Sequence, residues 1–180
     1  MITVVAVSGS RRERSYTRKS LQIVLDAVRG GDVETDLIDL GAVDLPLYHP
    51  DRDEQGDSAE LTRRVREAEA VVLGSPVYHG SYSSAFRNFH DYCSKEEFRE
   101  TAVGLVATAG GGSYGATLEH MRSTVRGVYG HTVPEQVGVR SASKKYDGDR
   151  LTDGDTRRRL EELGVAVVEE ARRLHPDSRG

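Results

Sequence analysis

Short apolar runs alternate with amphipathic stretches along most of the 180-residue chain. A run that is apolar almost throughout, such as 4–7 or 70–74, is typical of a strand covered on both faces of a parallel sheet. We expect Pro76 to stop the second of these, while Pro134 and Gly138 disfavour the last strand of the pattern. Runs rich in β-branched residues also indicate strands. Together, the two kinds of run predict strands at 4–7, at 33–40, at 70–74, within 101–112 and at 132–139.

Between these strands, apolar residues recur three or four positions apart, which is the spacing of one helix face. Ser58 is expected to cap the second helix, and Ser83 or Ser84 the third. A long polar loop at 41–57 and a polar tail at 175–180 complete the pattern. The five predicted faces carry Leu21, Val24, Leu25 and Val28; Leu61, Val65 and Ala68; Phe86, Phe89 and Cys93; Leu118, Met121, Val125 and Val128; and Leu160, Leu163, Val167, Ala171 and Leu174.

Strands that alternate with helices indicate an α/β fold, with a parallel sheet covered by helices on both faces. Right-handed crossovers leave few ways to wind five such strands. The flavodoxin-like order 2-1-3-4-5 suits them and puts the switch point between the first and third strands. Without a linker or an internal repeat, residues 1–180 are predicted to form a single domain.

Composition disfavours several classes of function. A net charge of −4 and an isoelectric point near 5.9 leave no overall basic surface for nucleic acid. Cys93, the only cysteine, cannot form an internal disulfide, which favours a reducing compartment. No stretch reaches the ~20 apolar residues of a membrane helix, and the chain enters a strand at once, so we expect no signal peptide. We therefore predict a cytoplasmic protein, and no metal site, because the six histidines lack metal-ligand spacing.

Ligands of an open parallel sheet bind beyond the carboxyl ends of its strands, next to the switch point. Three loops are predicted to reach that edge, at 8–17, 75–83 and 108–114. These are also the three least ordinary stretches of the sequence, which predicts a binding site formed by all three.

The first loop, VSGSRRERSYTR, combines hydroxyl groups with Arg11, Arg12 and Arg14 at the predicted start of a helix. Backbone N–H groups at such a terminus attract an anion, and arginine adds bidentate bonds to phosphate oxygens. The loop therefore predicts a phosphate site. The alternative is a solvated arginine face, because arginine is common throughout this chain. The loop matches neither G-x-G-x-x-G nor G-x-x-x-x-G-K-[ST], which disfavours a Rossmann site and a P-loop.

The other two loops offer aromatic rings and bare backbone. SPVYHGSYS exposes Tyr78, His79 and Tyr82, which suit a planar heterocycle; alternatively, the tyrosines only cover the sheet edge. ATAGGGSYG has three successive glycines, so its amides can approach a flat ligand. At the pyrimidine edge of a flavin they would stabilise the negative charge that reduction creates. As an alternative, this loop is only a flexible turn.

Cys93 suggests a different chemistry. CSKEEFR, residues 93–99, has the C-x5-R spacing of tyrosine phosphatases. The segment lacks glycine, is predicted to continue a helix and lies far from the switch point. A buried structural thiol is therefore the favoured interpretation.

Taken together, these motifs resemble those of a known family. SGSRRERSYT resembles the G-S-x-R-x-x-S-x-N phosphate loop of the NADPH-dependent FMN reductases, and SPVYHGSYSSAFRNFHDY is similar to their P-x-Y-[NH]-G-S-x-x-x-x-[LF]-[KR]-N-x-x-D motif. LEHMRSTVRGVYGHTVPEQV is similar to a later part of the family, so the likeness spans about 4–139. It implies a flavodoxin-like fold, non-covalent FMN, NADPH or NADH as the reductant, and a homodimer or homotetramer.

The resemblance also implies binding roles by position. Thr17 stands where the family usually has asparagine, and Val77 replaces a common glutamate, so contact at Val77 would be through the backbone. The implied phosphate ligands are Ser10, Arg12, Ser15 and Thr17. The residues implied to border the ring are Pro76, Val77, Tyr78 and His79 on one side and Thr108, Gly110, Gly111, Gly112 and Ser113 on the other.

The implied activity is hydride transfer from a nicotinamide to FMN and onward to an acceptor. A free flavin, a quinone, an azo compound and a metal oxyanion all fit as the acceptor. Because the cofactor supplies the chemistry, no catalytic acid or base is predicted. A flavodoxin-type electron carrier is the main alternative, although its T/S-x-T-G-x-T loop differs from this arginine-rich one; a phosphatase using Cys93 is the second.

Overall fold

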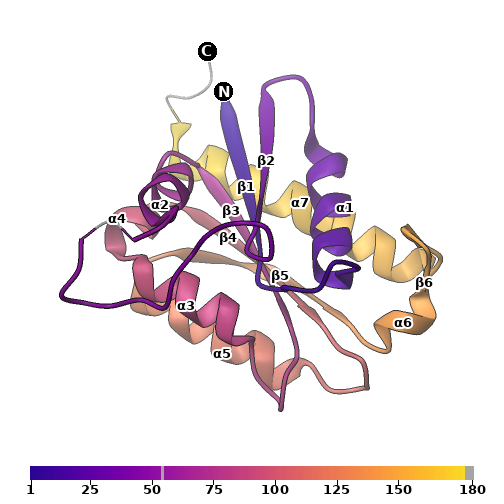
Figure 1. The fold of residues 1–180 in the computed structure, drawn as a ribbon. Coiled ribbons are helices and arrows are strands. Elements are labelled where there is room, and N and C mark those ends of the chain that lie inside the picture. The colour runs from indigo at the N-terminus through magenta and orange to yellow at the C-terminus, as the bar shows by residue number, and fades with distance from the viewer. Residues whose placement is uncertain (54, 177–180) are drawn as a thin grey trace.

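The computed structural model describes residues 1–53 and 55–176, in which five parallel strands form the central sheet (Figure 1). The strand order is β2-β1-β3-β4-β5, which confirms the prediction. β1 and β3 are neighbours in the sheet but not in the sequence, and they mark the switch point. The strands are β1 (Ile2–Ser8), β2 (Val33–Asp39), β3 (Ala70–Pro76), β4 (Ala102–Thr108) and β5 (His131–Val139).

Helices cover both faces of this sheet. Residues along β1 alternate between two apolar cores, with Val4 and Ala6 in one and Val5 and Val7 in the other. This two-sided burial explains why the first run of the chain is continuously apolar. One face is covered by α1 (Tyr16–Val28) and α7 (Gly154–Leu174), and the other by α2 (Ser58–Arg66), α3 (Ser84–Tyr92) and α5 (Gly115–Gly127) (Figure 1).

Two predicted boundaries are wrong. β3 continues through Pro76, which pairs with Thr108 at the end of β4. Proline is tolerated there because β1 pairs with β3 only as far as Gly74, so no ladder bond toward β1 is needed at position 76. Ser58 is the first residue of α2 and not its cap; its hydroxyl accepts a bond from the Gln55 N–H at 3.0 Å.

The chain around Cys93 is not a continuous helix, contrary to the prediction. α3 ends at Tyr92, Cys93 follows in extended conformation, and a separate short helix, α4 (Lys95–Phe98), comes next. Ser94 and Glu97 form a capping box, in which the Ser94 N–H donates to the Glu97 carboxylate at 2.7 Å. This start signal interrupts the helix because it satisfies N–H groups that a continuous helix would have bonded internally.

The segment between β5 and α7 contains elements that the sequence pattern does not predict. Helix α6 (Ala142–Lys145) leads into a hairpin of β6 (Tyr146–Asp147) and β7 (Arg150–Leu151). The hairpin is bonded to α1, since Lys19 Nζ donates to the Gly148 carbonyl at 2.7 Å. These elements are too short to produce a periodic signal.

α7 ends at Leu174, as the apolar spacing predicts. Of the predicted polar tail, residues 177–180 lie outside the described part of the chain. Within residues 1–53 and 55–176, no helix is both long and apolar enough to span a membrane.

Candidate functional site

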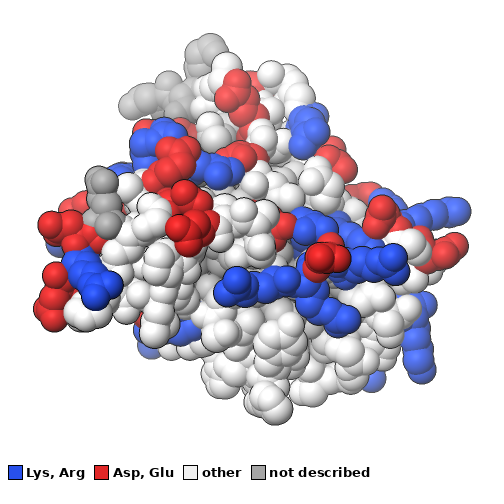
Figure 2. All heavy atoms as spheres, viewed as in Figure 1, with Lys and Arg blue, Asp and Glu red and all other residues white. Residues whose placement is uncertain are grey.

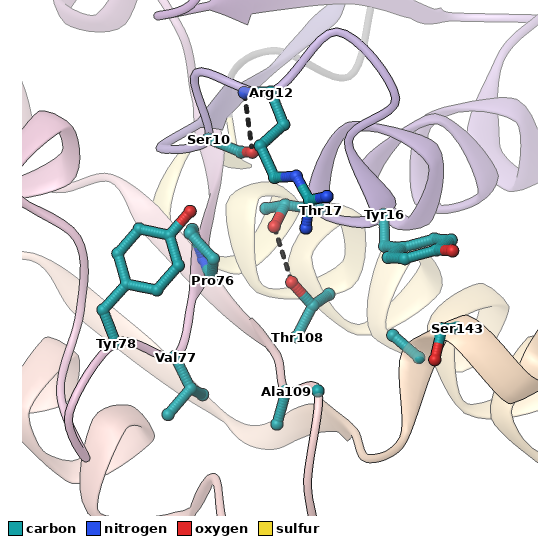
Figure 3. A pocket seen from close by; sticks show the side chains of 12 residues that line it. Ser10, Arg12, Tyr16, Thr17, Pro76, Val77, Tyr78, Thr108, Ala109 and Ser143 are labelled. Atoms are coloured by element: carbon teal, nitrogen blue, oxygen red, sulfur yellow. Dashed lines mark hydrogen bonds between the residues drawn. The ribbon is translucent and has the colours of Figure 1, made fainter.

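A pocket of about 200 Å³ opens at the carboxyl edge of the sheet, where β1, β3 and β4 end (Figure 3). All three loops predicted from the sequence contribute to it, and so does α6. The position agrees with the rule that ligands of open α/β sheets bind at the switch point. The pocket is lined by Ser10, Arg12, Tyr16, Thr17, Pro76, Val77, Tyr78, Thr108, Ala109, Gly110, Ala142 and Ser143.

The first loop turns directly into α1. Ser15 caps the helix, and its side chain accepts a bond from the Arg18 N–H at 3.0 Å. The N–H groups of Tyr16 and Thr17 in the first turn have no acceptor among the described residues, as is usual at a helix start. These donors, together with the positive end of the helix dipole, favour an anion.

The arginines of the first loop differ in their contacts. Arg18 is engaged, because it donates to Asp39 at 2.6 Å and also to the Glu13 carbonyl. Arg12 extends its side chain over the pocket (Figure 3), whereas Arg11 does not line it. Neither Arg11 nor Arg12 forms a side-chain ion pair within the described part of the chain. Arg12 is therefore the arginine placed to meet a phosphate.

Close contacts hold the three loops together below the pocket. The buried hydroxyls of Thr17 and Thr108 are 2.6 Å apart (Figure 3). The Gly9 N–H donates to the Gly74 carbonyl at 2.8 Å. Ser83, which caps α3 as predicted, donates its hydroxyl to the Gly9 carbonyl at 2.5 Å. The loops therefore keep fixed positions relative to one another.

The second loop forms a tight turn at the rim of the pocket. Tyr78 and Ser81 exchange backbone hydrogen bonds of 2.9 and 3.1 Å. The turn between them uses positive φ at His79 (51°) and Gly80 (79°). The Tyr78 side chain stands on the wall opposite Tyr16, with 47% of its surface exposed (Figure 3). A half-exposed ring at this rim offers a surface to a planar ligand.

The third loop presents bare backbone at the mouth of the pocket. A Cβ atom added to Gly110 or Gly111 would meet nothing within 4 Å. The Gly111 carbonyl accepts a bond from the Ser141 N–H at 2.9 Å, and the Ala109 carbonyl accepts one from the Ala142 N–H at 3.0 Å. These two bonds tie the loop to the start of α6 and bring that helix to the pocket.

The structure brings together most of the predicted binding residues. Those that line the pocket are Ser10, Arg12, Thr17, Pro76, Val77, Tyr78, Thr108 and Gly110. Those that do not line it are Ser15, which caps α1, and the exposed residues His79, Gly111, Gly112 and Ser113. Sequence reasoning missed Tyr16, Ala109, Ala142 and Ser143. The first two adjoin predicted positions, whereas no motif pointed to α6.

Charge is distributed unevenly around this edge of the sheet. Basic side chains gather over the first loop and the start of α1, and the surface below them is uncharged (Figure 2). The loops that follow β3 and β4 belong to two stretches, 70–86 and 101–118, that contain no Asp, Glu, Lys or Arg. One end of the site thus suits a phosphate and the other a neutral ring system.

Cys93 is not suited to nucleophilic catalysis. Burial raises the pKa of its thiol well above the usual value, and the nearby Glu97 carboxylate raises this pKa further. A neutral thiol is a poor nucleophile, and Cys93 does not line the pocket. Among the residues described, no group of three or more His, Cys, Asp or Glu side chains could hold a metal ion.

The pocket residues fit the parts of FMN. The guanidinium of Arg12, the Ser10 hydroxyl and the free N–H groups of α1 match a phosphate in charge and hydrogen bonding. Tyr78 and the open backbone at Gly110 match the flat ring system. The chemistry of these donors thus agrees with a flavin mononucleotide.

Solved structures with this fold include flavin enzymes. FerB, a flavoenzyme NAD(P)H:(acceptor) oxidoreductase from Paracoccus denitrificans, has a TM-score of 0.80 at 22% identity, covering 96% of this chain and 98% of that one. The apo form of the NADH:FMN oxidoreductase EmoB has a TM-score of 0.74 at 18% identity, covering 93% and 90%. Both structures share the flavodoxin-like fold of this chain.

Sequence comparison identifies the family. The family model for NADPH-dependent FMN reductase matches residues 2–144. An NADPH azoreductase of Bacillus sp. (strain OY1-2) is 33% identical over 93% of this chain and 89% of the relative. An FMN-dependent NADPH-azoreductase of Staphylococcus saprophyticus is 31% identical over 82% of this chain and 80% of the relative. The chain belongs to the NADPH-dependent FMN reductase family and is an FMN-dependent NAD(P)H oxidoreductase.

Proposed function

We propose that the switch-point pocket holds FMN, with the phosphate at the first loop and the ring between the second and third loops. The observation that carries this proposal is the meeting of three loops, distant in sequence, around one pocket. The pocket has a cation at one end and uncharged backbone at the other, as the parts of FMN require.

Different groups would hold the two ends of the cofactor. Arg12, Ser10 and Thr17 would contact the phosphate directly, whereas Ser15 would act mainly by capping α1. Thr108 would position Thr17 through their hydrogen bond of 2.6 Å. The ring would lie against the turn at 76–79 on one side and the glycines at 110–112 with Ser113 on the other.

When bound, FMN supplies the redox chemistry, since it can take a hydride from a nicotinamide and pass electrons to an acceptor. The residues of this chain bind and orient the cofactor. The pocket lining contains no Asp, Glu, His, Lys or Cys, so we propose that water at the open rim delivers the protons. N–H groups of the third loop would stabilise negative charge at the pyrimidine edge.

We propose a flat aromatic acceptor, either an azo compound or a quinone. The relatives named azoreductases support this choice. The uncharged rim with the exposed ring of Tyr78 also supports it, because such a surface suits stacking better than binding of a metal oxyanion.

The test of cofactor binding starts with the purified protein. FMN should copurify, or bind on addition, and the cofactor released by heat should run as FMN in chromatography. Recovery of stoichiometric FAD, or no binding of either flavin, would contradict the proposal. Multiple turnovers of NADPH with an azo dye or a quinone, and with no second protein present, would distinguish this enzyme from a flavodoxin-type electron carrier.

We also propose that the protein is a cytoplasmic homodimer or homotetramer, with α3 and the loop at 41–57 near the contact. This loop is fixed to α3, because the Tyr92 hydroxyl and the Asn88 amide donate to the Pro46 carbonyl at 2.9 and 2.8 Å. Within this loop, Leu47 is 82% exposed and Tyr48 is 40% exposed. Light scattering at micromolar concentration should show at least twice the monomer mass; a species of about 20 kDa alone would contradict this proposal.

A further inference from the structure

A second pocket adjoins the cofactor pocket and shares Tyr16 with it. It has a volume of about 460 Å³ and lies between the start of α1 and the β6–β7 hairpin. Its lining consists of Arg14, Tyr16, Lys19, Tyr146, Gly148 and Asp149. The ring of Tyr16 stands at the side of the cofactor pocket away from Tyr78 (Figure 3), and the same residue lines the second pocket.

The walls of the second pocket are held by specific contacts. The rings of Tyr16 and Tyr146 have centroids 5.2 Å apart, and the Tyr146 hydroxyl is 2.7 Å from that of Ser20. Lys19 fixes the hairpin through its bond of 2.7 Å to the Gly148 carbonyl. Tyr146 is buried and supports the partly exposed Tyr16 ring, so Tyr16 and the hairpin form the preorganised surface that an aromatic base can contact.

The charges in the second pocket are only partly matched. Lys19 pairs with the Asp149 carboxylate at 3.0 Å, and only 14% of the Lys19 side chain is exposed. Arg14 is exposed and makes no side-chain hydrogen bond or ion pair with any residue in the described ranges. The second pocket thus contains aromatic rings and one unmatched guanidinium, which together suit an aromatic ligand that carries a phosphate.

The reductant of this family is such a ligand. A pocket of about 200 Å³ cannot hold FMN and also a whole dinucleotide, so most of the reductant must lie outside it. We propose that the second pocket receives the adenosine 2′-phosphate half of NADPH. Arg14 binds the 2′-phosphate, and the Tyr16 ring contacts the adenine. The proposal rests on the nicotinamide-dependent function above and makes Arg14 a residue that favours NADPH over NADH.

The experiment measures two fragments of the reductant by calorimetry on the FMN-loaded protein. Adenosine 2′,5′-bisphosphate carries the 2′-phosphate, and 5′-AMP lacks it. Arg14→Ala should weaken the bisphosphate by roughly 5- to 30-fold and 5′-AMP by less than about 2-fold. Arg11→Ala is the matched control, because Arg11 is an exposed arginine of the same loop that lines neither pocket; it should change neither affinity appreciably.

A variant with the opposite expected sign sharpens the test. Asp149 is 95% exposed and places a carboxylate beside the same pocket. Asp149→Asn should therefore bind the bisphosphate about 2- to 5-fold more tightly. In steady state, Arg14→Ala should raise the KM for NADPH and leave the KM for NADH and the affinity for FMN unchanged.

Several outcomes would overturn the proposal. The first is that the wild type does not bind the bisphosphate. The second is that Arg14→Ala loses affinity equally for the two fragments, and the third is that it loses affinity for neither. A parallel loss of FMN affinity would place Arg14 in the cofactor phosphate site instead. Failure of the proposed function would look different from failure of this inference. In that case the wild-type protein would bind no FMN, regardless of whether it binds the bisphosphate.

Discussion

The first and third loops meet at one pocket but are built to contact a ligand in different ways. The first loop carries Arg11, Arg12 and Arg14 beside a helix terminus. The third, at 108–114, has no charged residue and exposes backbone at its glycines. Charge attracts and positions a phosphate, whereas bare backbone lets a flat ring approach closely and leaves one of its faces open. We therefore expect the first loop to govern the affinity for the cofactor and the third loop to govern access to its reactive face.

The same two loops also differ in packing. A Cβ atom at Gly9 would lie 2.9 Å from Cβ of Phe86 and 3.0 Å from the Gly74 carbonyl oxygen. At Gly111 the same atom would meet nothing within 4 Å. The packing of the core therefore requires glycine at position 9. At position 111 the packing places no such requirement, so only contact with a ligand could make glycine necessary there.

The largest effect is expected from Arg12→Ala. The change removes a hydrogen bond to a charged group, worth about 1.5–3 kcal/mol, so FMN should bind roughly 10- to 150-fold more weakly. Riboflavin lacks the phosphate and should bind almost as tightly as before. A fluorescence titration with both ligands measures this difference.

Arg11→Ala is the control for this measurement, because Arg11 does not line the cofactor pocket. Equal losses for FMN and riboflavin in Arg12→Ala would mean that Arg12 supports the fold. If Arg12→Ala lost affinity for neither ligand, the arginines would be only a solvated face. The first loop would then have no role in binding the phosphate.

Gly9→Ala should destabilise the protein even without ligand. The new methyl group overpacks the contact with Phe86, which costs about 1–3 kcal/mol, and the melting temperature should fall by roughly 2–12 °C. Gly111→Ala is the matched substitution in the third loop and should stay within ~0.5 kcal/mol of wild type. Thermal unfolding measures both melting temperatures. Similar decreases in the two variants would contradict the proposed difference in packing between Gly9 and Gly111.

Ser83→Ala tests the connection between the first loop and α3. It removes the cap on the Phe86 N–H and the bond to the Gly9 carbonyl, so the free energy of unfolding should fall by about 1 kcal/mol. Ser84, the exposed neighbour, caps nothing, and Ser84→Ala should have almost no effect. Urea unfolding that ranks the two serines in the opposite order would contradict the capping assignment.

The smallest effect is expected from salt. Raising NaCl from 50 to 500 mM shortens the range of the arginine charges, so FMN should bind about two- to five-fold more weakly. Riboflavin binding involves no phosphate and should stay constant over the same range. If both affinities changed in parallel, the charged end of the site would not be specific for the phosphate.

Much of the fold could be predicted because its signals are local. The apolar run at 4–7 is continuous because neighbouring residues of β1 enter opposite cores, and this burial leaves its pattern in the sequence. The three loops could likewise be found, since each interrupts a regular pattern with residues of unusual chemistry. The individual binding residues were implied by the resemblance to the family, and eight of them, from Ser10 to Gly110, line the pocket.

Other features depend on which of two local hydrogen-bonding arrangements a residue adopts. The helix does not continue past Tyr92, because Ser94 starts a new helix in which the Glu97 carboxylate accepts a bond from the Ser94 N–H. Ser58 resembles a cap, but its hydroxyl accepts from Gln55, outside the helix. In both places the residue types allow two local structures, and the surrounding packing selects one.

The sequence by itself determined the class of sheet, the three loops at its edge and the cationic, hydroxyl-rich character of the first, because apolar periodicity and local residue chemistry encode them. Only the tertiary structure decided the fourth wall of the pocket. α6 reaches the site through the Ala142 N–H bond to the Ala109 carbonyl, and the hairpin reaches α1 through Lys19 and Gly148. Backbone carbonyls accept these bonds, and every residue type has such a carbonyl. No pattern of side chains could therefore have shown which segments would meet.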